Sequence, residues 1–450
     1  MFPYKKASIL GLGKTGIATA NFLYSKKVEV FVSESADKDK AAGNLSLLNE
    51  KIKYEIGGHT EKIFNSGLII KSPGIPSDLP ILLRAKQKNI RILSEIELAA
   101  SLIKPKLLVA ITGTNGKTTT TMMVGEVFKS SGFKTVVAGN IGMPLISFVD
   151  DINSDTVVVV EVSSYQLEDT EKFKPGIACI LNITPDHLEH HKTMENYINV
   201  KENIFRNQTK EDYCILNYDD ENCRKMSGKY HSTVVFVSQK QRLKAGISYD
   251  SVSKEVFISL PFLKPSNYHF SLNLIIPGRH NIENALFTLS AGILAGIEPE
   301  LIKKTLEGFQ GVEHRLELVR KINGIKYIND SKSTNVDSTF VALESFSGNV
   351  ILIMGGRHKG ASYTPLKNLV KDKVKKLLLI GEAAEIIEKD LTETSEIIEV
   401  KTLKNAVKIA SETAKPGDVV LLSPGCSSFD QFDNFEQRGS EFKKLVNSLN

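Results

Sequence analysis

The sequence lacks any apolar run that approaches the roughly 20 residues needed to span a membrane, and its first residues contain no apolar core of a secretory signal. It has only four cysteines, with no C-x-x-C spacing, at positions Cys179, Cys214, Cys223 and Cys426. We therefore expect reduced structural thiols, with no disulfides and no zinc site. These absences predict a cytoplasmic protein that works without a membrane.

A strong charge of one sign is also missing. The 57 Lys and Arg residues exceed the 52 Asp and Glu residues by a net +5, and this mild excess is spread along the chain. Such a balance argues against a nucleic-acid partner. The 450 residues contain no internal repeat and no low-complexity tract, and at roughly 100–200 residues per domain they suggest about three domains.

Short apolar runs alternate with helical patterns almost throughout, which is typical of βαβ units and largely parallel sheets. We predict strands at residues 7–10, 28–32, 68–70, 155–160, 179–183, 325–328, 350–354, 377–380 and 419–422. Residues 213–277 are richer in alternating β patterns (233–237, 256–260 and 270–276) and predict a strand-rich flank. Breaks near 94–105 and 308–311 predict α/β domains at residues 1–95, 96–310 and 311–450, the first and last Rossmann-like and the central one of P-loop ATPase type.

The most informative stretch is Ile-Thr-Gly-Thr-Asn-Gly-Lys-Thr-Thr at residues 111–119, which follows an apolar run and precedes a helical pattern. Glycines let the backbone approach phosphates, and a helix N-terminus presents free N–H groups to them. Lys117 supplies a cation and Thr118 a hydroxyl for Mg²⁺. The first glycine, Gly113, departs from the G-x-x-x-x-G-K-[ST] spacing, so an ordinary glycine turn is the alternative to the ATP site that we predict.

A second glycine turn, residues 11–16, matches G-x-G-x-x-G between a strand and a helix. Glu34, eighteen residues past Gly16, stands where a dinucleotide site has the acid that holds a ribose hydroxyl. NAD, another nucleotide diphosphate, or a tight turn without ligand all fit this pattern. The separate ATP loop counts against a simple dehydrogenase.

Other clusters also fall just after strand ends, where open α/β sheets bind ligands. Glu161 ends a β-branched strand and is a candidate Mg²⁺ ligand. His187 follows the next strand, whereas we expect His190 and His191 to be solvated. Asn281 and Asn284 lie one turn apart at the start of a helix, which suits either an adenine edge or a helix cap.

The last third carries loops rich in Lys, Ser and Thr at strand ends, at residues 329–335, 355–360 and 423–439. Lysine ammonium groups and hydroxyls in such loops suit a small dicarboxylate.

Together these motifs resemble the Mur ligase family, the ATP-dependent amide ligases of peptidoglycan precursor synthesis, over essentially the whole chain. The resemblance rests on residues 113–118, 161–164, 280–284, 314–315 and 330–332. Residues 329–335 and 423–439 are similar to the D-glutamate-adding branch, and residues 11–16 and 72–75 agree with it. The absence of an Asp-Asn-Pro-Arg stretch weighs against the next ligase of the pathway.

The resemblance implies a reaction and a set of site residues. The enzyme would add D-glutamate to UDP-N-acetylmuramoyl-L-alanine through an acyl phosphate, and we expect a monomer. The UDP-substrate would contact Lys14, Thr15, Ser33, Glu34, Ser72, Asn140 and Ser163. ATP would contact Gly113, Thr114, Asn115, Gly116, Lys117, Thr118 and Thr119, with Asn281 and Asn284 on adenine, Arg315 on the phosphates and Asp330 on the ribose.

The same resemblance implies two Mg²⁺ sites and an amino-acid site. Thr118 and Glu161 would hold one Mg²⁺ and His187 a second, with Lys201 acting as a carbamate. The catalytic set would then be Lys117, Glu161, His187 and Lys201. The amino acid would meet Lys332, Thr334, Lys359, Ser428 and Phe435, with His314 as a possible helper.

Three competing interpretations stay open from the sequence. A folylpolyglutamate synthase-like ligase shares the chemistry, but the complete N-terminal UDP-type domain argues against it. A nicotinamide dehydrogenase leaves the ATP loop without a role. A regulatory P-loop switch predicts nucleotide binding without dependence on an amino acid.

Overall fold

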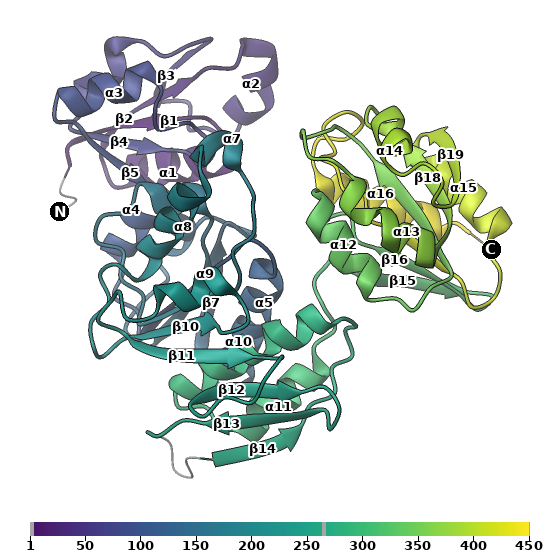
Figure 1. Ribbon diagram of the computed structural model, residues 1–450. Helices are drawn as coiled ribbons and strands as arrows, with labels where there is room; N and C mark the ends of the chain where they lie inside the picture. Colours follow the sequence, from purple (N-terminus) through teal and green to yellow (C-terminus); the bar gives the residue numbers. More distant parts are fainter. Residues whose placement is uncertain (1–3, 263–266, 450) are drawn as a thin grey trace. The chain divides into compact units, whose positions relative to one another are not determined.

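The computed structural model describes residues 4–262 and 267–449, and they form two compact units. The first unit is Met1–Asn273 with Glu283–Leu306, and the second is Leu274–Ile282 with Glu307–Asn450. Among the described residues, none of the helices combines the length and the apolar composition that a membrane span requires. Three sheets organise the chain, two in the first unit and one in the second (Figure 1).

The first sheet has five parallel strands in the order β3-β2-β1-β4-β5. They are β1 (Lys6–Leu10), β2 (Glu29–Glu34), β3 (Lys53–Ile56), β4 (Leu68–Lys71) and β5 (Arg91–Ser94). The helices between and after them are α1 (Lys14–Ser25), α2 (Lys38–Leu45), α3 (Pro80–Gln87) and α4 (Glu95–Leu102). Strand order reverses at β1 and β4, so the Gly11 turn and Ser72 follow the two strands where a doubly wound sheet binds its ligand.

The second sheet has nine strands in the order β14-β13-β12-β11-β10-β9-β6-β8-β7. Its parallel part contains β6 (Leu107–Thr112), β7 (Lys134–Gly139), β8 (Thr156–Glu161), β9 (Ile177–Ile180), β10 (Tyr213–Asn217), β11 (Thr233–Ser238) and β12 (Gly246–Asp250). Strands β13 (Glu255–Ser259) and β14 (Asn267–Ser271) continue it antiparallel. The predicted strand-rich flank is therefore present.

Helices of this part position the candidate site. They are α5 (Lys117–Ser130), α6 (Ser164–Glu168), α7 (Leu188–His191), α8 (Met194–Glu202), α9 (Glu221–Met226), α10 (Arg279–Leu294) and α11 (Pro299–Gly308). All six residues of β8 are buried, as expected for a parallel strand covered on both faces.

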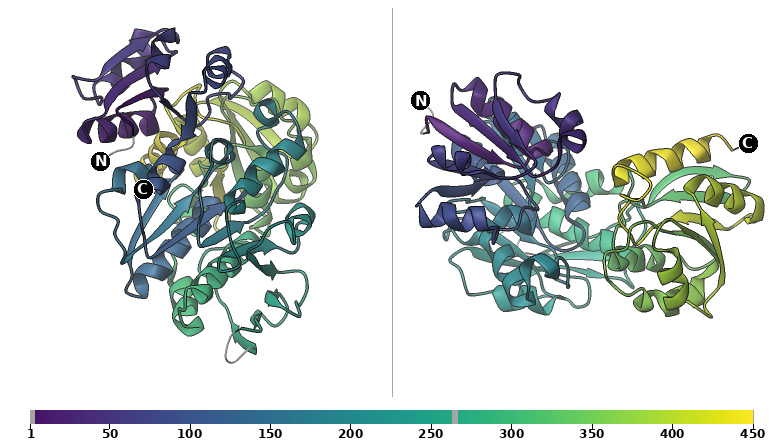
Figure 2. Two further views of the ribbon diagram at one scale, coloured as in Figure 1. Left: turned by 90° about the vertical axis from the view of Figure 1, so that its left-hand side faces the viewer. Right: turned by 90° about the horizontal axis from the view of Figure 1, so that it is seen from above.

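The third sheet has the order β15-β16-β20-β17-β18-β19, in which only the β15–β16 pair is antiparallel. Its strands are β15 (Glu317–Ile322), β16 (Ile325–Asn329), β17 (Val350–Gly355), β18 (Val374–Ile380), β19 (Glu396–Lys401) and β20 (Val419–Leu422). One face packs against α12 (Val336–Glu344), α13 (Lys367–Lys373) and α14 (Ala384–Asp390), and the other against α15 (Leu403–Thr413) and α16 (Phe435–Asn447) (Figure 2).

The predicted α/β fold class is confirmed, with two corrections to strand positions. Strand β14 ends at Ser271, not at residue 276, because residues 274–282 belong to the second unit and Ile276 lies close to Gly311 there. Strand β9 spans residues 177–180, not 179–183, because Asn182 and Thr184 leave the sheet and bond to the phosphate loop. The four cysteines are buried free thiols, as predicted.

Candidate active site

The phosphate loop lies between β6 and α5, where two glycines take conformations that L-residues rarely adopt. Gly113 has φ +153°, and Gly116, directly before the helix, has φ +84°. An added Cβ on Gly116 would lie 2.5 Å from Asn284 Oδ1, so this glycine also provides room for α10. The helix N-terminus thus opens onto the loop, which suits it to an anion.

Residues beyond β9 hold this loop in place. The Asn115 amide donates to Asn182 Oδ1 at 2.8 Å, and the Thr114 amide donates to the Asn182 carbonyl at 2.9 Å. Thr114 Oγ1 lies 3.1 Å from the Tyr197 hydroxyl. Sequence reasoning missed Asn182, which it placed inside the predicted strand at residues 179–183; a polar residue within that apolar run was the signal.

The remaining loop residues point toward phosphate chemistry. Lys117 Nζ donates to the carbonyls of Gly113 at 3.0 Å and Thr114 at 2.7 Å, so its ammonium lies over the loop. Thr118 and Thr119 are buried in the first turn of α5. Their contact with ATP stays a prediction.

Glu161 ends β8 and pairs in register with Ile111 of β6, immediately before the loop. Asn140 donates its side-chain Nδ2 to Glu161 Oε1 at 2.8 Å and its amide to the Glu161 carbonyl at 2.9 Å. Glu161 Oε2 is buried and has no hydrogen-bond partner among the residues that the structure describes. A carboxylate with one oxygen fixed and the other unpaired is suited to Mg²⁺, which takes oxygen ligands.

No group of three or more His, Cys, Asp or Glu side chains could hold a metal ion within residues 4–262 and 267–449. An Mg²⁺ ion would therefore depend on Glu161, a threonine hydroxyl and oxygens brought by the nucleotide.

Lys201 is buried inside α8, with 1% of its surface exposed. Its Nζ donates to the Gly113 carbonyl at 2.9 Å and to Thr112 Oγ1 at 3.3 Å. Burial lowers the pKa of Lys201 well below its usual value, and the nearby charge of Lys117 lowers it further. The amine is thereby favoured in its neutral form, directly beneath the phosphate loop.

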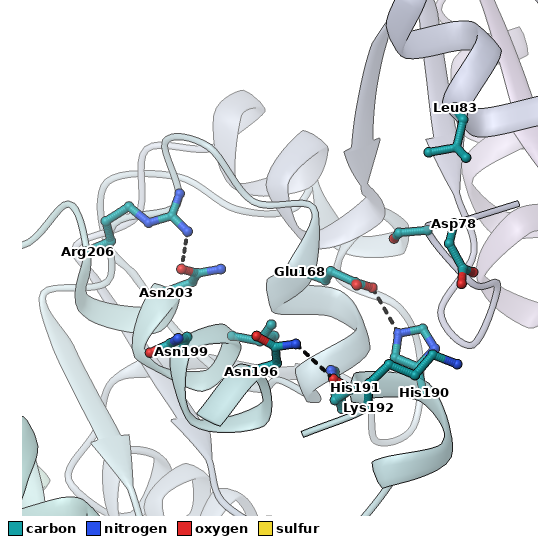
Figure 3. Close-up of a pocket in the computed structure, with 12 residues that line it drawn as sticks. Asp78, Leu83, Glu168, His190, His191, Lys192, Asn196, Asn199, Asn203 and Arg206 are labelled. Atoms are coloured by element: carbon teal, nitrogen blue, oxygen red, sulfur yellow. Dashed lines mark hydrogen bonds and ion pairs between the residues drawn. The ribbon is translucent and has the colours of Figure 1, made fainter. Parts of the chain in front are cut away.

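His187 stands at the start of α7 with φ +55°, and its Nδ1 lies 3.1 Å from the Tyr165 hydroxyl. The prediction that His190 and His191 are solvated is wrong. Only 8% of the His190 side chain is exposed, and its ring lies against Tyr165. Its Nε2 lies 3.1 Å from Glu168 Oε2 (Figure 3). His191 is 5% exposed and lies 3.0 Å from Ser164 Oγ, and burial lowers its pKa to about 4.

The turn of the first sheet is closed by its own residues. A Cβ on Gly16 would collide with the Gly11 carbonyl, and Ser72 Oγ donates to that carbonyl at 3.3 Å. Glu34 accepts the Leu12 amide at 2.6 Å, so the predicted ribose acid contacts the turn itself.

The other predicted UDP residues divide into accessible and enclosed ones. Lys14 Nζ, next to Thr15, donates to the Gly142 carbonyl at 2.5 Å and so connects the turn with the loop after Asn140. Ser33 is fully buried, and its hydroxyl lies 2.8 Å from both Glu55 Oε1 and His59 Nδ1. Ser163 caps α6 in a reciprocal pair with Gln166.

Helix α10 carries the two predicted adenine residues. Asn281 is its third residue, so the alternative that Asn281 caps the helix is wrong, and its Nδ2 donates to the Pro277 carbonyl at 2.6 Å. Asn284 Oδ1 accepts from Thr120 Oγ1 at 3.1 Å, which ties it to α5. Their contact with adenine stays a prediction.

In the second unit, the candidate loops follow β16, β20 and β17, three neighbouring strands of one sheet. They carry the predicted amino-acid residues: Lys332 and Thr334 after β16, Ser428 after β20, and Lys359 after β17. Lys332 Nζ lies 5.2 Å from the centre of the Phe435 ring, whereas Lys359 is exposed.

Asp330 connects these loops through buried hydrogen bonds. It is fully buried and accepts hydrogen bonds from the hydroxyls of Ser333 at 2.5 Å and Ser423 at 2.8 Å and from the Leu316 amide at 3.2 Å. Burial raises the pKa of Asp330, and the charge of Arg315 opposes the rise. Its role on the ribose stays a prediction.

Sequence reasoning missed Arg438, which is 1% exposed. Its guanidinium donates to Ser331 Oγ at 3.0 Å, to the Ser331 carbonyl at 2.9 Å, and to the carbonyls of Cys426 at 3.3 Å and Ser427 at 3.4 Å. It thereby joins the loops after β16 and β20. Its spacing with Phe442 and Val446, at i, i+4 and i+8, was the signal, because it puts a charge on the apolar stripe of α16.

Comparison with known proteins agrees with this geometry. Family models match in chain order: the Mur ligase MurD-like N-terminal domain at residues 5–94, the Mur ligase middle domain at 111–292, and the Mur ligase glutamate ligase domain at 314–426. The chain is 44% identical to the UDP-N-acetylmuramoylalanine–D-glutamate ligase of Koribacter versatilis (99% of this chain, 98% of that one) and 40% identical to that of Clostridioides difficile (99% of each).

Among solved structures, UDP-N-acetylmuramate–alanine ligase from Thermotoga maritima superimposes with a TM-score of 0.62 at 20% identity, covering 98% of this chain and 99% of that one, which shows likeness of fold. The full-length sequence identities show more than fold: the chain belongs to the Mur ligase family.

Proposed function

We propose that this chain is the ATP-dependent ligase that joins D-glutamate to UDP-N-acetylmuramoyl-L-alanine in peptidoglycan precursor synthesis. The observation that carries the proposal is the phosphate loop at residues 113–118, with the unpaired oxygen of Glu161 at the end of the adjacent strand. Relatives of 40–44% identity over nearly the full chain are named for this activity. The family model matched at residues 314–426 is a glutamate ligase domain.

The reaction follows from the residues around the loop. The terminal carboxylate of the UDP-substrate attacks the γ-phosphoryl group of ATP, which gives an acyl phosphate and ADP. The ammonium of Lys117 and the amides at the start of α5 offset the charge on the transferred group. The amine of D-glutamate then attacks the acyl carbon and phosphate leaves.

Thr118 and Glu161 would hold one Mg²⁺, and His187 a second. Bound there, the ions neutralise phosphate charge during transfer. The donor set fits, because a buried carboxylate oxygen without a hydrogen-bond partner stands beside the loop. Asn140 fixes the other oxygen of Glu161 and so aims the unpaired one.

Lys201 is proposed to carry a carbamate. An ammonium cannot ligate Mg²⁺, whereas a neutral amine adds CO₂ through a new N–C bond and releases one proton to solvent, which gives a carbamate with an anionic oxygen pair. Support comes from the burial that lowers the pKa of Lys201 and from its bond to the Gly113 carbonyl. Activity should decay in CO₂-depleted buffer and return with bicarbonate, and Lys201→Ala should be inactive under both conditions. Full activity of Lys201→Ala would refute the role.

Each of the three predicted domains is proposed to bind one substrate. Residues 1–95 would bind the UDP part of the UDP-substrate, residues 96–310 would bind ATP, and residues 311–450 would bind the amino acid. In the last, Lys332, Thr334, Lys359, Ser428 and Phe435 would place D-glutamate, since ammonium groups and hydroxyls suit its two carboxylates. We also expect a monomer that acts in the cytoplasm, which sedimentation and cell fractionation would check.

The decisive experiment measures phosphate release from ATP and Mg²⁺ with UDP-N-acetylmuramoyl-L-alanine. The amino acids compared are D-Glu, L-Glu, D-Asp, L-Lys and none. Release that requires D-Glu and the UDP-substrate together is the expected result. Release with another amino acid would reassign the pocket of the second unit, and no release from a folded, ATP-binding protein would refute the ligase proposal.

A further inference from the structure

A buried ion pair joins the first sheet to helix α6 within the first unit. Lys71, the last residue of β4, has 1% of its side chain exposed, and its Nζ lies 2.7 Å from Asp169 Oδ2 and 3.2 Å from Glu168 Oε2. The same ammonium donates to Ser77 Oγ at 2.5 Å. Glu168 is the last residue of α6 and Asp169 follows it, so the single ammonium group of Lys71 pairs with two adjacent carboxylates at the end of this helix.

The two segments that this ion pair joins both contain residues of the candidate site. On one side, Ser72 follows Lys71, donates its amide to the Leu10 carbonyl at 2.9 Å, and contacts the Gly11 carbonyl through its hydroxyl. On the other, α6 has only five residues and begins three residues after Glu161. Lys71 therefore connects the segment that carries Ser72 with the short helix that follows Glu161.

The electrostatics make this cation difficult to replace. Burial raises the pKa of Asp169, and Lys71 acts against that rise. Burial also acts to raise the pKa of Glu168, but Lys71 and the hydrogen bond with His190 outweigh it and the net shift is downward. Glu168 and His190 meet on the wall of a pocket of about 500 Å³ (Figure 3). Without Lys71, two adjacent, largely buried carboxylates would lose their cation.

We propose that Lys71 is a positioning residue. Its ion pair with Asp169 and Glu168 holds the loop at Ser72 at a fixed distance from Glu161. The inference rests on the proposed function, in which one substrate reaches from the Gly11 turn to the reacting carboxyl group. Such a substrate needs both ends of its site at a fixed separation. ATP contacts the phosphate loop, which is held by Asn182 and not by Lys71.

The test compares Lys71→Met with Lys71→Arg and with Lys26→Met. Lys26 Nζ lies 2.6 Å from Asp150 Oδ1, so this ion pair also joins a segment of the first sheet's part of the chain to a segment of the second's. Both side chains are exposed, so loss of the pair should have little effect. Lys71→Met should lower kcat/KM for the UDP-substrate about 100-fold while the KM for ATP changes by less than about twofold. Lys71→Arg should recover most of the loss, because it keeps the charge.

Direct titrations of the UDP-substrate and of a non-hydrolysable ATP analogue accompany the kinetics. If Lys71→Met does not fold, the double variant Lys71→Met/Asp169→Asn replaces it, since it removes a charge from each side. That variant should fold, bind the ATP analogue and still bind the UDP-substrate weakly.

Three results would overturn the inference. They are an unchanged kcat/KM for the UDP-substrate in Lys71→Met, a parallel loss of ATP binding, or an Arg variant as defective as the Met variant. If the proposed function is wrong, the wild-type protein will show no D-glutamate-dependent turnover. The two titrations would still decide whether Lys71 supports binding of the UDP-substrate.

Discussion

The left-handed glycine before α5 offers a direct test of the phosphate loop. Gly116 has φ +84°, and an added Cβ would lie 2.5 Å from Asn284 Oδ1. Gly132, two residues beyond the end of the same helix, has φ +83°, but a Cβ there would meet nothing within 4 Å. Gly132→Ala is therefore a matched control that has the same backbone strain without the contact.

The two substitutions should differ by a predictable amount. An L-residue in the left-handed region costs about 1–2 kcal/mol, which applies to both variants. Gly116→Ala must also displace Asn284 and break its hydrogen bond with Thr120, which adds roughly 1 kcal/mol. At about 2–4 °C per kcal/mol, Gly116→Ala should melt a few degrees below Gly132→Ala.

Nucleotide binding should report the same difference. If the extra free energy acts on the binding conformation of the loop, the affinity for a non-hydrolysable ATP analogue should fall about fivefold to tenfold in Gly116→Ala and stay unchanged in Gly132→Ala. Removing the obstruction tests the cause: in an Asn284→Ala background, Gly116→Ala should be no more damaging than Gly132→Ala. Equal melting temperatures and affinities for the two single variants would refute the reasoning.

Three further predictions follow from individual residues. Burial raises the pKa of Glu95 from 4.5 to about 7, so the protonated form is stabilised in the fold and stability should fall as pH rises from about 4.5 to 7. Glu95→Gln should abolish that fall in melting temperature; an equally steep decline in the variant would contradict it. Glu161→Gln keeps an oxygen for Asn140 but removes the charge, so kcat should drop about 100-fold or more and the Mg²⁺ requirement for phosphate release should rise, whereas an unaltered Mg²⁺ titration would argue against metal binding there. Lys359→Ala should raise the KM for the amino acid far more than that for ATP, and equal increases would exclude a specific role.

Sequence periodicity predicted most of the interior strands and missed mainly strands at sheet edges. Central strands such as β8 and β17 are buried along their whole length and apolar over most of it, so they stand out as continuous runs. Most of the strands that were not predicted, β3, β5, β7, β15 and β19, lie at sheet edges, as does the misplaced β14. Two others, β10 and β12, lie inside the second sheet. Edge strands carry charged side chains and lack a fully buried face, which removes the hydrophobic signal.

Some residues of the candidate site could also be predicted from the sequence, and others could not. Glycines and the residues beside them could be found because backbone conformation restricts what a turn accepts, and Gly113 and Gly116 do take the rare conformations that the motif suggested. Partners distant in sequence could not be found. Asn182 holds a loop 67 residues earlier, and Glu34 bonds to a turn 22 residues before it, contacts that no local pattern encodes.

Buried cations were the least visible of all, because a charged residue in a sequence is ordinarily assigned to the surface. Lys71 and Arg438 are both 2% exposed or less, and each joins segments about a hundred residues apart, at separations of 97 and 107 residues. Each nevertheless leaves a local mark: Lys71 extends a fully buried strand by one residue, and Arg438 occupies the apolar stripe of α16. A charge placed where the hydrophobic pattern requires an apolar residue is costly unless it is paired. Such positions therefore indicate where loops that carry the reaction are tied together.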